Sequence, residues 1–399
     1  MAARYKFNRM EVAGSLGDLG TLLPIAIAMV LVNGLSPMGV FFSVGVFYII
    51  TGLYYGITVP VQPMKVIGAY AIAASLNAPE ILASSLMLGA VLLIVGLTGA
   101  IELIRKYTPK PVIRGVQLST GALLIASGIK FMMGTSAFQT LQQSAEPHLS
   151  VQSIGMVPIG IIIGVAGGLI TLYFLENRRF PAALIVIIVG LATGLLLGAR
   201  MDFGAQAIRL HIPDFLPFPF PERLDFTFAL FALVLPQLPM TLGNAVLAYT
   251  DLSEEYFGKE SIKVTNRKVC VSMALANLMS FCFGGMPMCH GAGGLAAHYR
   301  FGARTAGSNL IIGGFFILMV LVFGNNIVGF FNLLPLSILG ILLVFAGSQL
   351  ALTIRDLETR KECFVAILIL GITLASNLAA GFVTGIVVAQ LLKWDRLSV

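Results

Sequence analysis

Residues 58–71 read TVPVQPMKVIGAYA, and residues 284–297 read GGMPMCHGAGGLAA. Each stretch carries Pro-Met ahead of small and apolar residues, and each lies inside a longer apolar region. Proline has no backbone N–H to donate and disfavours helix in the residue before it. Each stretch therefore predicts a helix that begins in the middle of an apolar region rather than at its edge.

The two interrupted helices should begin close to their Pro-Met pairs. The prolines of the first stretch should keep residues 58–62 extended and start a helix near Met64, and Pro287 should start a second helix near Met288. The amino end of a helix exposes unpaired N–H groups and about half a positive charge. Two such ends that face each other would form an anion site, and interrupted helices in two halves of a chain indicate a transporter's binding site. The alternative is a pair of proline kinks packed in a helix bundle.

The composition indicates a membrane protein. Hydrophobic residues make up 57% of the 399-residue chain and charged residues only 11%, whereas a soluble domain has about 25% charged residues. Apolar stretches of roughly 18 residues or more recur along the chain, as in membrane helices. The first of them, residues 12–32, is longer than the apolar core of a signal peptide and contains Asp18, so we interpret it as a membrane segment rather than a cleaved leader.

We predict an all-α integral membrane protein with fourteen transmembrane segments. Two of these segments are too short to cross a hydrocarbon core of about 30 Å as continuous helices, and they are the half-helices preceded by short extended stretches. The first seven segments are 11–32, 37–57, 60–76, 82–104, 112–132, 152–175 and 181–199, and the second seven are 226–249, 264–283, 286–299, 305–324, 328–352, 362–377 and 379–393.

The distribution of basic residues supports this count. With the amino terminus in the cytoplasm, most Lys and Arg residues fall in cytoplasmic loops, and both termini lie on the cytoplasmic side. Residues 200–225 are rich in proline and form the longest polar connection, on the outside. They divide the chain into a first repeat, residues 1–199, and a second repeat, residues 226–399. Because each repeat has an odd number of segments, the second enters the membrane in the opposite orientation, which makes an inverted repeat.

Lys65 and Asp18 are charged residues within predicted membrane segments. A lysine at the bilayer centre costs roughly 2.5–3.5 kcal/mol, and in the first turn of a helix it also opposes the helix dipole. A negative partner should offset both effects, and it is either a bound anion or Asp18. Snorkelling of Lys65 to the cytoplasmic surface is a third interpretation. Asp18 is a candidate for carrying a coupling proton or positioning Lys65, and the simpler alternative is a carboxylate that reaches water at a helix end.

Uncharged polar residues accompany these charges. Gln62 precedes the first half-helix, and Gln237, Thr241 and Asn244 lie in the segment that opens the second half. Amide and hydroxyl donors suit a transported oxyanion because they bind it without holding it irreversibly. Hydrogen bonds between helices explain the same residues equally well.

The second half-helix should carry His290 in its first turn, where it is an anion donor, a proton-linked switch or a packing residue. Gly291, Gly293 and Gly294 leave the backbone open to a ligand or to a neighbouring helix. None of the four cysteines forms a CxxC pair, and no further ligands are spaced to complete a metal site at Cys289, so we expect no metal and no cofactor. The substrate-binding candidates are Gln62, Met64, Lys65, Gln237, Thr241, Asn244, Met288, Cys289, His290 and Gly291, with Asp18 as a coupling or ion-pair residue.

Four stretches resemble the molybdate transporters, a family related to the sulfate permeases and nucleobase permeases. They are SLGDLGTLLP, PVQPMKVIGAYAI, LPQLPMTLGNAVLA and GGMPMCHGAGGLAAHYRFGARTAGS, and they come from both halves. The resemblance implies a seven-plus-seven inverted repeat with core and gate domains, and molybdate or sulfate as the substrate. It assigns a binding role to Gln62 and Lys65, to Gln237 and Asn244, and to His290 with its glycines. The chain ends directly after its last predicted segment, so we expect no carboxy-terminal cytoplasmic regulatory domain of the kind that sulfate permeases carry.

The resulting prediction is a secondary transporter that takes up molybdate, a tetrahedral oxyanion, by alternating access. The alternatives are a permease for sulfate or another small anion, an anion channel and a nucleobase permease. An enzyme would need a cluster of acid, base or metal-binding residues at one membrane face, and the 4 histidines have no paired carboxylates beside them. We expect a multi-pass protein of the plasma or inner membrane that contacts lipids and binds no nucleic acid. A homodimer is compatible with the sequence.

Overall fold

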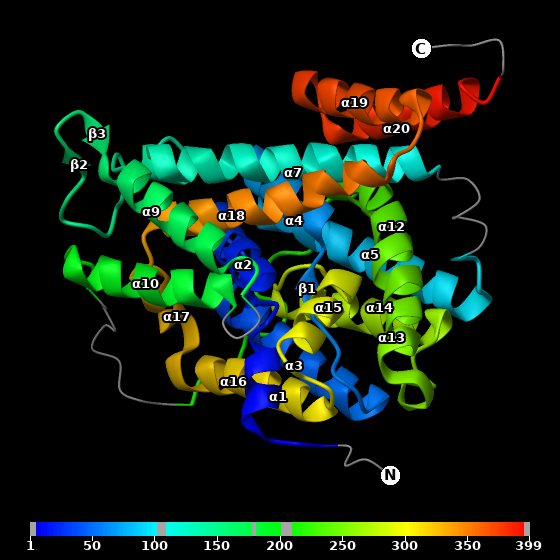
Figure 1. Cartoon of the computed structure of the whole chain (residues 1–399), viewed down its shortest axis with the longest axis horizontal. Helices are drawn as coiled ribbons and strands as arrows, with labels where there is room; N and C mark the ends of the chain where they lie inside the picture. Colours follow the sequence, from blue (N-terminus) through cyan, green and yellow to red (C-terminus); the bar gives the residue numbers. More distant parts are fainter. Residues whose placement is uncertain (1–4, 102–108, 178–180, 201–209, 395–399) are drawn as a thin grey trace.

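The computed structural model describes residues 5–101, 109–177, 181–200 and 210–394, and these are mostly helical (Figure 1). The helices before residue 200 are α1 (Arg9–Ser15), α2 (Leu19–Asn33), α3 (Pro37–Tyr55), α4 (Lys65–Ala74), α5 (Ala78–Thr98), α7 (Lys110–Met133), α8 (Ala137–Leu141), α9 (Ile159–Phe174) and α10 (Ala182–Leu196). The helices after residue 210 are α11 (Arg223–Ala229), α12 (Leu235–Met240), α13 (Tyr249–Phe257), α14 (Asn266–Phe283), α15 (Ala292–Arg300), α16 (Ala306–Phe323), α17 (Ile327–Phe331), α18 (Leu336–Ala351), α19 (Arg360–Ala375) and α20 (Leu378–Leu391). The strands are β1 (Gln62–Pro63), β2 (Ser153–Ile154), β3 (Val157–Pro158) and β4 (Met288–Cys289).

The helices form two bundles (Figure 1). The crossover bundle contains α1–α5 and α14–α16, with α3 packed on α16 and α14 packed on α5. The α7–α18 bundle is built on α7 and α18, which lie side by side, and it also contains α9, α10, α19 and α20. The largest apolar core fills the crossover bundle, and two smaller apolar clusters fill the α7–α18 bundle and its contacts with α4 and α12.

Glycine pairs bring α7 and α18 together through their backbones. A Cβ added to Gly347 would lie 2.6 Å from the carbonyl oxygen of Gly121, and one added to Gly340 would lie 2.5 Å from that of Gly128. Association of helices in a bilayer releases no hydrophobic surface from water, so close packing of small residues stabilises it instead. The high glycine content of the chain therefore has a direct packing role at this contact.

Six helical runs in the described residues are long and apolar enough to cross a membrane, and the bent pair α1–α2 makes a seventh. Each of the fourteen predicted segments overlaps a helix of the structure, which confirms the helical, multi-pass class. Several of these helices, including α4, α9, α10 and α20, are shorter than a full span. The count of fourteen membrane crossings therefore stays a prediction.

The first predicted segment, residues 11–32, differs from a continuous helix. Between Ser15 and Leu19 the chain turns, and α1 and α2 meet at an angle of 43°. A Cβ on Gly17, inside this turn, would lie 2.9 Å from the carbonyl oxygen of Ala297 in α15, so the turn packs tightly against the second half-helix. The break leaves Asp18 at the amino end of α2.

The segment that opens the second half is continuous but irregular. Residues 223–257 run through α11, α12 and α13 with two π-helical stretches, Leu230–Val234 and Thr241–Ala248, on either side of α12. Two prolines lie in α12 itself. Proline removes a backbone donor and clashes with the preceding turn, and the wider π turns accommodate such defects.

The predicted polar connection, residues 200–225, is only partly described, because residues 201–209 lie outside the described residues. The same holds for the last residues of the predicted segment 82–104. Residues 210–222 contain no helix or strand, as their prolines predict, and α11 begins at Arg223. Two backbone hydrogen bonds hold this stretch to α14 and α16, one of them from the N–H of Leu216 to the carbonyl oxygen of Cys282 at 2.7 Å.

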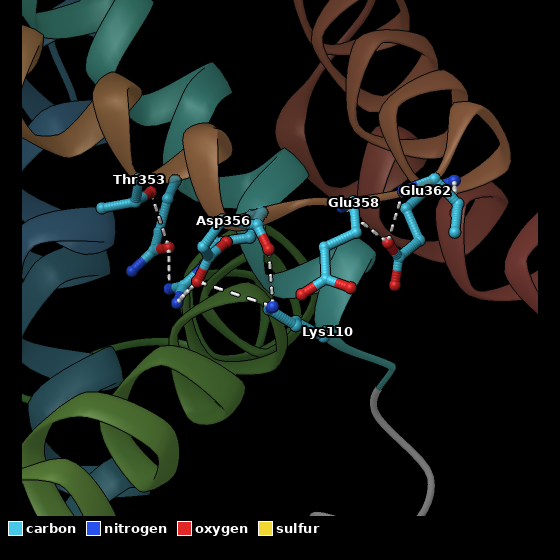
Figure 2. Close-up of polar contacts among 8 residues, drawn as sticks. Lys110, Thr353, Asp356, Glu358 and Glu362 are labelled. Carbon is cyan, nitrogen blue, oxygen red and sulfur yellow. Dashed lines mark hydrogen bonds and ion pairs between the residues drawn. The ribbon is translucent and has the colours of Figure 1, made fainter.

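A polar cluster joins the amino end of α7 to the segment between α18 and α19 (Figure 2). The Lys110 amine donates to the carbonyl oxygen of Asp356 at 2.7 Å, and Arg114 Nε donates to the Asp356 carboxylate at 2.9 Å. Glu362 accepts the backbone N–H of Glu358 at 3.1 Å and closes the start of α19. Each exposed ion pair of this kind contributes about 0–1 kcal/mol, so the cluster chiefly fixes how α19 leaves α18.

Candidate functional site

The strands β1 and β4 cross inside the crossover bundle. They pair antiparallel, with Gln62 opposite Cys289 and Pro63 opposite Met288. Helix α4 follows β1 and α15 follows β4, so the two half-helices leave this short ladder in opposite directions with their amino ends close to it (Figure 1). The predicted interruption of both helices is therefore confirmed.

The predicted start of the second half-helix is wrong by four residues. We expected a helix from Met288 with His290 in its first turn, but α15 begins at Ala292 after Gly291. The reason is the strand pairing: Asn277 of α14 donates to the Met288 carbonyl oxygen at 2.8 Å and accepts its N–H at 3.1 Å, which holds this residue extended. Local sequence pattern does not reveal such a partner.

His290 is enclosed in the crossover bundle, between the β1 arm and α14. Its Nδ1 lies 2.9 Å from the carbonyl oxygen of Pro60, and its Nε2 lies 3.0 Å from Ser272 Oγ. The ring is fully buried and packs on Phe47 and Tyr249, with ring centroids 4.7 and 5.4 Å away. Both ring nitrogens thus have protein partners, and His290 fastens the β1 arm to α14.

Two N–H groups in the first turn of α4 are hydrogen-bonded to a side chain of the protein itself. Gln237 Oε1 accepts the backbone N–H groups of Val66 and Ile67 at 3.0 and 3.3 Å, and Gln237 Nε2 donates to Thr241 Oγ1 at 2.8 Å. These bonds match the alternative of hydrogen bonds between helices, with a helix cap supplied from the other half of the chain, and the role of Gln237 and Thr241 as oxyanion donors stays a prediction. Asn244 lies further along the same π-helical stretch and is half-buried.

The amino end of α15 is open. Within the described part of the chain, the N–H groups of Ala292, Gly293 and Gly294 have no hydrogen-bond acceptor. A Cβ on Gly293 would meet nothing within 4 Å, whereas one on Gly291 would overlap the side chain of Gln62. The two half-helices thus differ: α4 is capped, and α15 presents free donors.

Asp18 and Gln62 form a buried pair beside this open end. Gln62 Nε2 donates to Asp18 Oδ1 at 2.8 Å. Asp18 Oδ2 and Gln62 Oε1 have no hydrogen-bond partner among the described residues, although both atoms are buried. A Cβ on Gly294 would lie 2.6 Å from Asp18 Oδ2, so the carboxylate rests against the first turn of α15.

A cavity of about 320 Å³ joins these groups. It lies between the two bundles, because its walls come from α2, α4 and α15 on one side and from α9, α10 and α18 on the other. Its polar lining includes Asp18, Gln62, Lys65, Thr21, Gly293, Arg300 and Gln349. The structure thus brings together three of the predicted site residues in one polar cavity and adds others.

Lys65, the first residue of α4, is half-buried in this cavity. Among the described residues no carboxylate lies within 4.0 Å of its amine, so the proposed permanent ion pair with Asp18 is not formed in this conformation. The bound-anion and ion-pair interpretations of Lys65 therefore both stay predictions.

The other predicted residues at the crossing are not part of the cavity lining. Met64, Met288 and Cys289 are buried in the apolar core of the crossover bundle. The N–H of Met64 donates to the carbonyl oxygen of Pro287 at 2.9 Å, which extends the strand pairing by one bond. These three side chains pack the β1–β4 crossing into the apolar core of the crossover bundle.

Sequence reasoning missed several polar residues of the cavity, among them Thr21, Thr171 and Gln349. Thr21 lies three residues after Asp18 on the first turns of α2, and this spacing was a usable signal. Gln349 comes from α18, and only the packing of α18 against α2 brings it to the cavity. Arg300 lines the cavity from the last turn of α15.

Residues 10–124 and 229–350 match the family model described as a molybdate transporter of the MFS superfamily. The chain is 33% identical to molybdate transporter 2 of Arabidopsis thaliana, over 97% of this chain and 88% of that protein. It is 31% identical to molybdate transporter 1 of the same plant, over 96% of this chain and 87% of that protein. It is 24% identical to the putative sulfate transporter YvdB of Bacillus subtilis, over 98% of this chain and 74% of that protein.

Solved structures share the fold at low sequence identity. The transmembrane domain of the cyanobacterial bicarbonate transporter BicA has a TM-score of 0.66 and 16% identity, over 96% of this chain and 97% of that one. The murine anion transporter Slc26a9 in the inward-facing state has a TM-score of 0.65 and 15% identity, over 98% of this chain and 69% of that one. The predicted relation to the sulfate permease type of fold is confirmed.

Proposed function

Because this chain belongs to the molybdate transporter family, whose members are membrane transporters and not enzymes, we propose that it takes up molybdate across the cell membrane by alternating access. The observation that carries this proposal is the cavity between the two bundles, where the Lys65 amine and the open amino end of α15 line the same space. A cation and free N–H donors together select for an anion.

The oxygen atoms of the anion would accept hydrogen bonds from the first N–H groups of α15, with Lys65 providing the opposite charge. The glycine at position 293 leaves room for an oxyanion to approach the backbone closely. Gln62 serves as a second positioning residue, because it holds Asp18 in place through its amide group. The volume of the cavity, about 320 Å³, leaves room for a tetrahedral oxyanion that keeps part of its hydration shell.

Asp18 is the proposed coupling residue. A carboxylate beside a bound dianion repels it, and at low effective dielectric this repulsion is large. Protonation of Asp18 would remove the repulsion and let the proton and the anion move together. The unpartnered Oδ2 atom of Asp18 is where this proton would sit.

Alternating access follows from the position of the cavity between two bundles. A displacement of the crossover bundle against the α7–α18 bundle would move the site from one membrane face to the other. The contact between the bundles uses small residues: a Cβ on Gly20 of α2 would lie 2.5 Å from Ala183 Cβ of α10. Small side chains permit sliding with few changes of rotamer.

We further propose the seven-plus-seven arrangement, with residues 1–199 and 226–399 as inverted repeats of fourteen segments in all and both termini in the cytoplasm. The antiparallel crossing of β1 with β4 supports it, because equivalent elements of inverted repeats run in opposite directions. A homodimer in the plasma or inner membrane is the proposed working form.

The direct test is molybdate uptake into proteoliposomes by the purified protein. Lys65→Ala should weaken molybdate binding by at least about thirtyfold, the effect expected when a charge partner is removed from a partly buried site. Lys130→Ala is the matched control, because Lys130 also lies in an apolar segment but does not line this cavity. Uptake no faster than in protein-free liposomes would refute the proposal.

Sulfate is the second candidate substrate, because the relative YvdB is described as a putative sulfate transporter. The donors of the cavity fit any tetrahedral dianion and do not by themselves distinguish the two. Competition decides between them: excess sulfate should displace labelled molybdate only if sulfate binds the same site. Displacement by chloride at equal concentration would contradict a dianion site altogether.

A further inference from the structure

A second cavity lies on the outer face of the crossover bundle, between α3 and α14. It has a volume of about 730 Å³ and is lined mainly by apolar side chains, including Ile50 and Leu275. These two side chains are 56% and 57% exposed. In a membrane-spanning bundle such apolar side chains face lipid, so the groove is open to the bilayer.

Basic residues gather at one end of this groove. Arg267 and Lys268 line it from the first turn of α14, which contains no acidic residue. Both are exposed, and neither side chain makes an ion pair or hydrogen bond within the described residues. Lys263 lies at the same end, where its amine donates to the carbonyl oxygen of Tyr54 at 3.1 Å. Two cations at a helix amino end oppose the helix dipole, and no carboxylate of the described residues forms an ion pair with either of them.

We propose that this groove binds an anionic phospholipid, with its phosphate on Arg267 and Lys268 and an acyl chain along the apolar wall. The apolar volume fits a hydrocarbon chain, and the basic end complements a phosphodiester. A neutral lipid would leave the basic residues without a partner. If a second copy of this chain occupied the groove instead, it would have to place a negative group next to Arg267 and Lys268.

The floor of the groove connects the lipid to the crossing of the half-helices. Tyr55 and Ser272 line the groove, and the Tyr55 hydroxyl donates to Ser272 Oγ at 3.1 Å. Ser272 Oγ lies 3.0 Å from His290, whose other ring nitrogen lies 2.9 Å from the carbonyl oxygen of Pro60. An acyl chain over this floor excludes water from the chain of hydrogen bonds and so stabilises the crossover bundle.

Native mass spectrometry of the purified protein tests the proposal with phosphatidylglycerol and phosphatidylcholine of the same acyl chains. The protein should retain phosphatidylglycerol in preference to phosphatidylcholine. Each basic residue near an anionic lipid surface contributes about fivefold to binding, so the double variant Arg267→Gln/Lys268→Gln should weaken phosphatidylglycerol binding by about thirtyfold. Leu275→Trp, which fills the groove, should also weaken it while leaving the basic residues intact.

The control is Lys259→Gln/Arg360→Gln, which removes the same charge from exposed positions outside the groove. It should leave phosphatidylglycerol binding unchanged. Equal retention of the two lipids, or unchanged binding in Arg267→Gln/Lys268→Gln, overturns the proposal. A Leu275→Trp variant that loses its dimer but keeps its lipid overturns it too, because the groove then belongs to a second copy of the chain.

Discussion

Gln237→Ala tests whether the protein itself holds the amino end of α4. Gln237 Oε1 accepts the N–H groups of Val66 and Ile67, and all three residues are no more than 1% exposed. Loss of a helix cap costs about 0.5–2 kcal/mol, and each buried N–H left without an acceptor costs about 1–3 kcal/mol. We expect the free energy of unfolding to fall by about 2–4 kcal/mol, because water has little access to these two groups.

Thermal unfolding in detergent measures this effect. For an unfolding entropy of about 2.1 cal/mol/K per residue, a loss of this size corresponds to a Tm lowered by about 2–5 °C. Thr241→Val removes only the hydroxyl that accepts from Gln237, so it should lower the Tm by less. Gln237→Glu keeps an acceptor at a helix amino end and should retain the Tm.

Molybdate binding by the same variants separates a cap from a ligand. The carboxylate of Gln237→Glu would lie beside the first turn of α4, close to Lys65, and should weaken binding of a dianion by about tenfold or more. A Gln237→Ala variant with unchanged Tm and much weaker molybdate binding would refute the cap and return Gln237 to the substrate site.

Three further outcomes follow from the geometry. Gly294→Ala places a methyl group 2.6 Å from Asp18 Oδ2, and this overpacking should cost about 1–3 kcal/mol and lower the Tm. Gly293→Ala, with no atom within 4 Å of the added methyl group, should leave the Tm unchanged or raise it. Equal changes of Tm in the two variants would contradict the packing described for α15. Gly340→Leu should separate α7 from α18 and sharply reduce folded protein in size-exclusion chromatography, and a normal elution profile would exclude the close backbone contact. Asp18→Asn should remove the pH dependence of molybdate uptake, and an unaltered pH profile would show that Asp18 carries no coupling proton.

The positions of the helices follow closely from hydrophobic patterning and proline placement. Each predicted segment overlaps a helix, and Pro63 ends an extended stretch directly before α4 as expected. The departures have a common cause. The turn before Asp18 packs tightly against α15, and Asn277 holds Met288 extended ahead of the late start of α15. Both involve contacts with residues distant in the sequence.

The candidate site likewise has a part that the sequence predicts and a part that depends on tertiary contacts. Asp18, Gln62 and Lys65 were predicted as candidates from their chemistry, and the structure places them in one cavity. Gln237 was predicted from the same kind of argument, yet it caps α4, because an amide in a membrane segment serves a backbone donor as readily as a ligand.

A multi-pass membrane protein with two interrupted helices can be predicted from the sequence alone, because the effects of proline and of apolar length act locally along the chain. Which helix end has free N–H groups, in contrast, follows from contacts between distant parts of the chain. The two ends carry similar dipoles, and the difference between them is an acceptor at Gln237 that reaches α4 from a segment about 170 residues away.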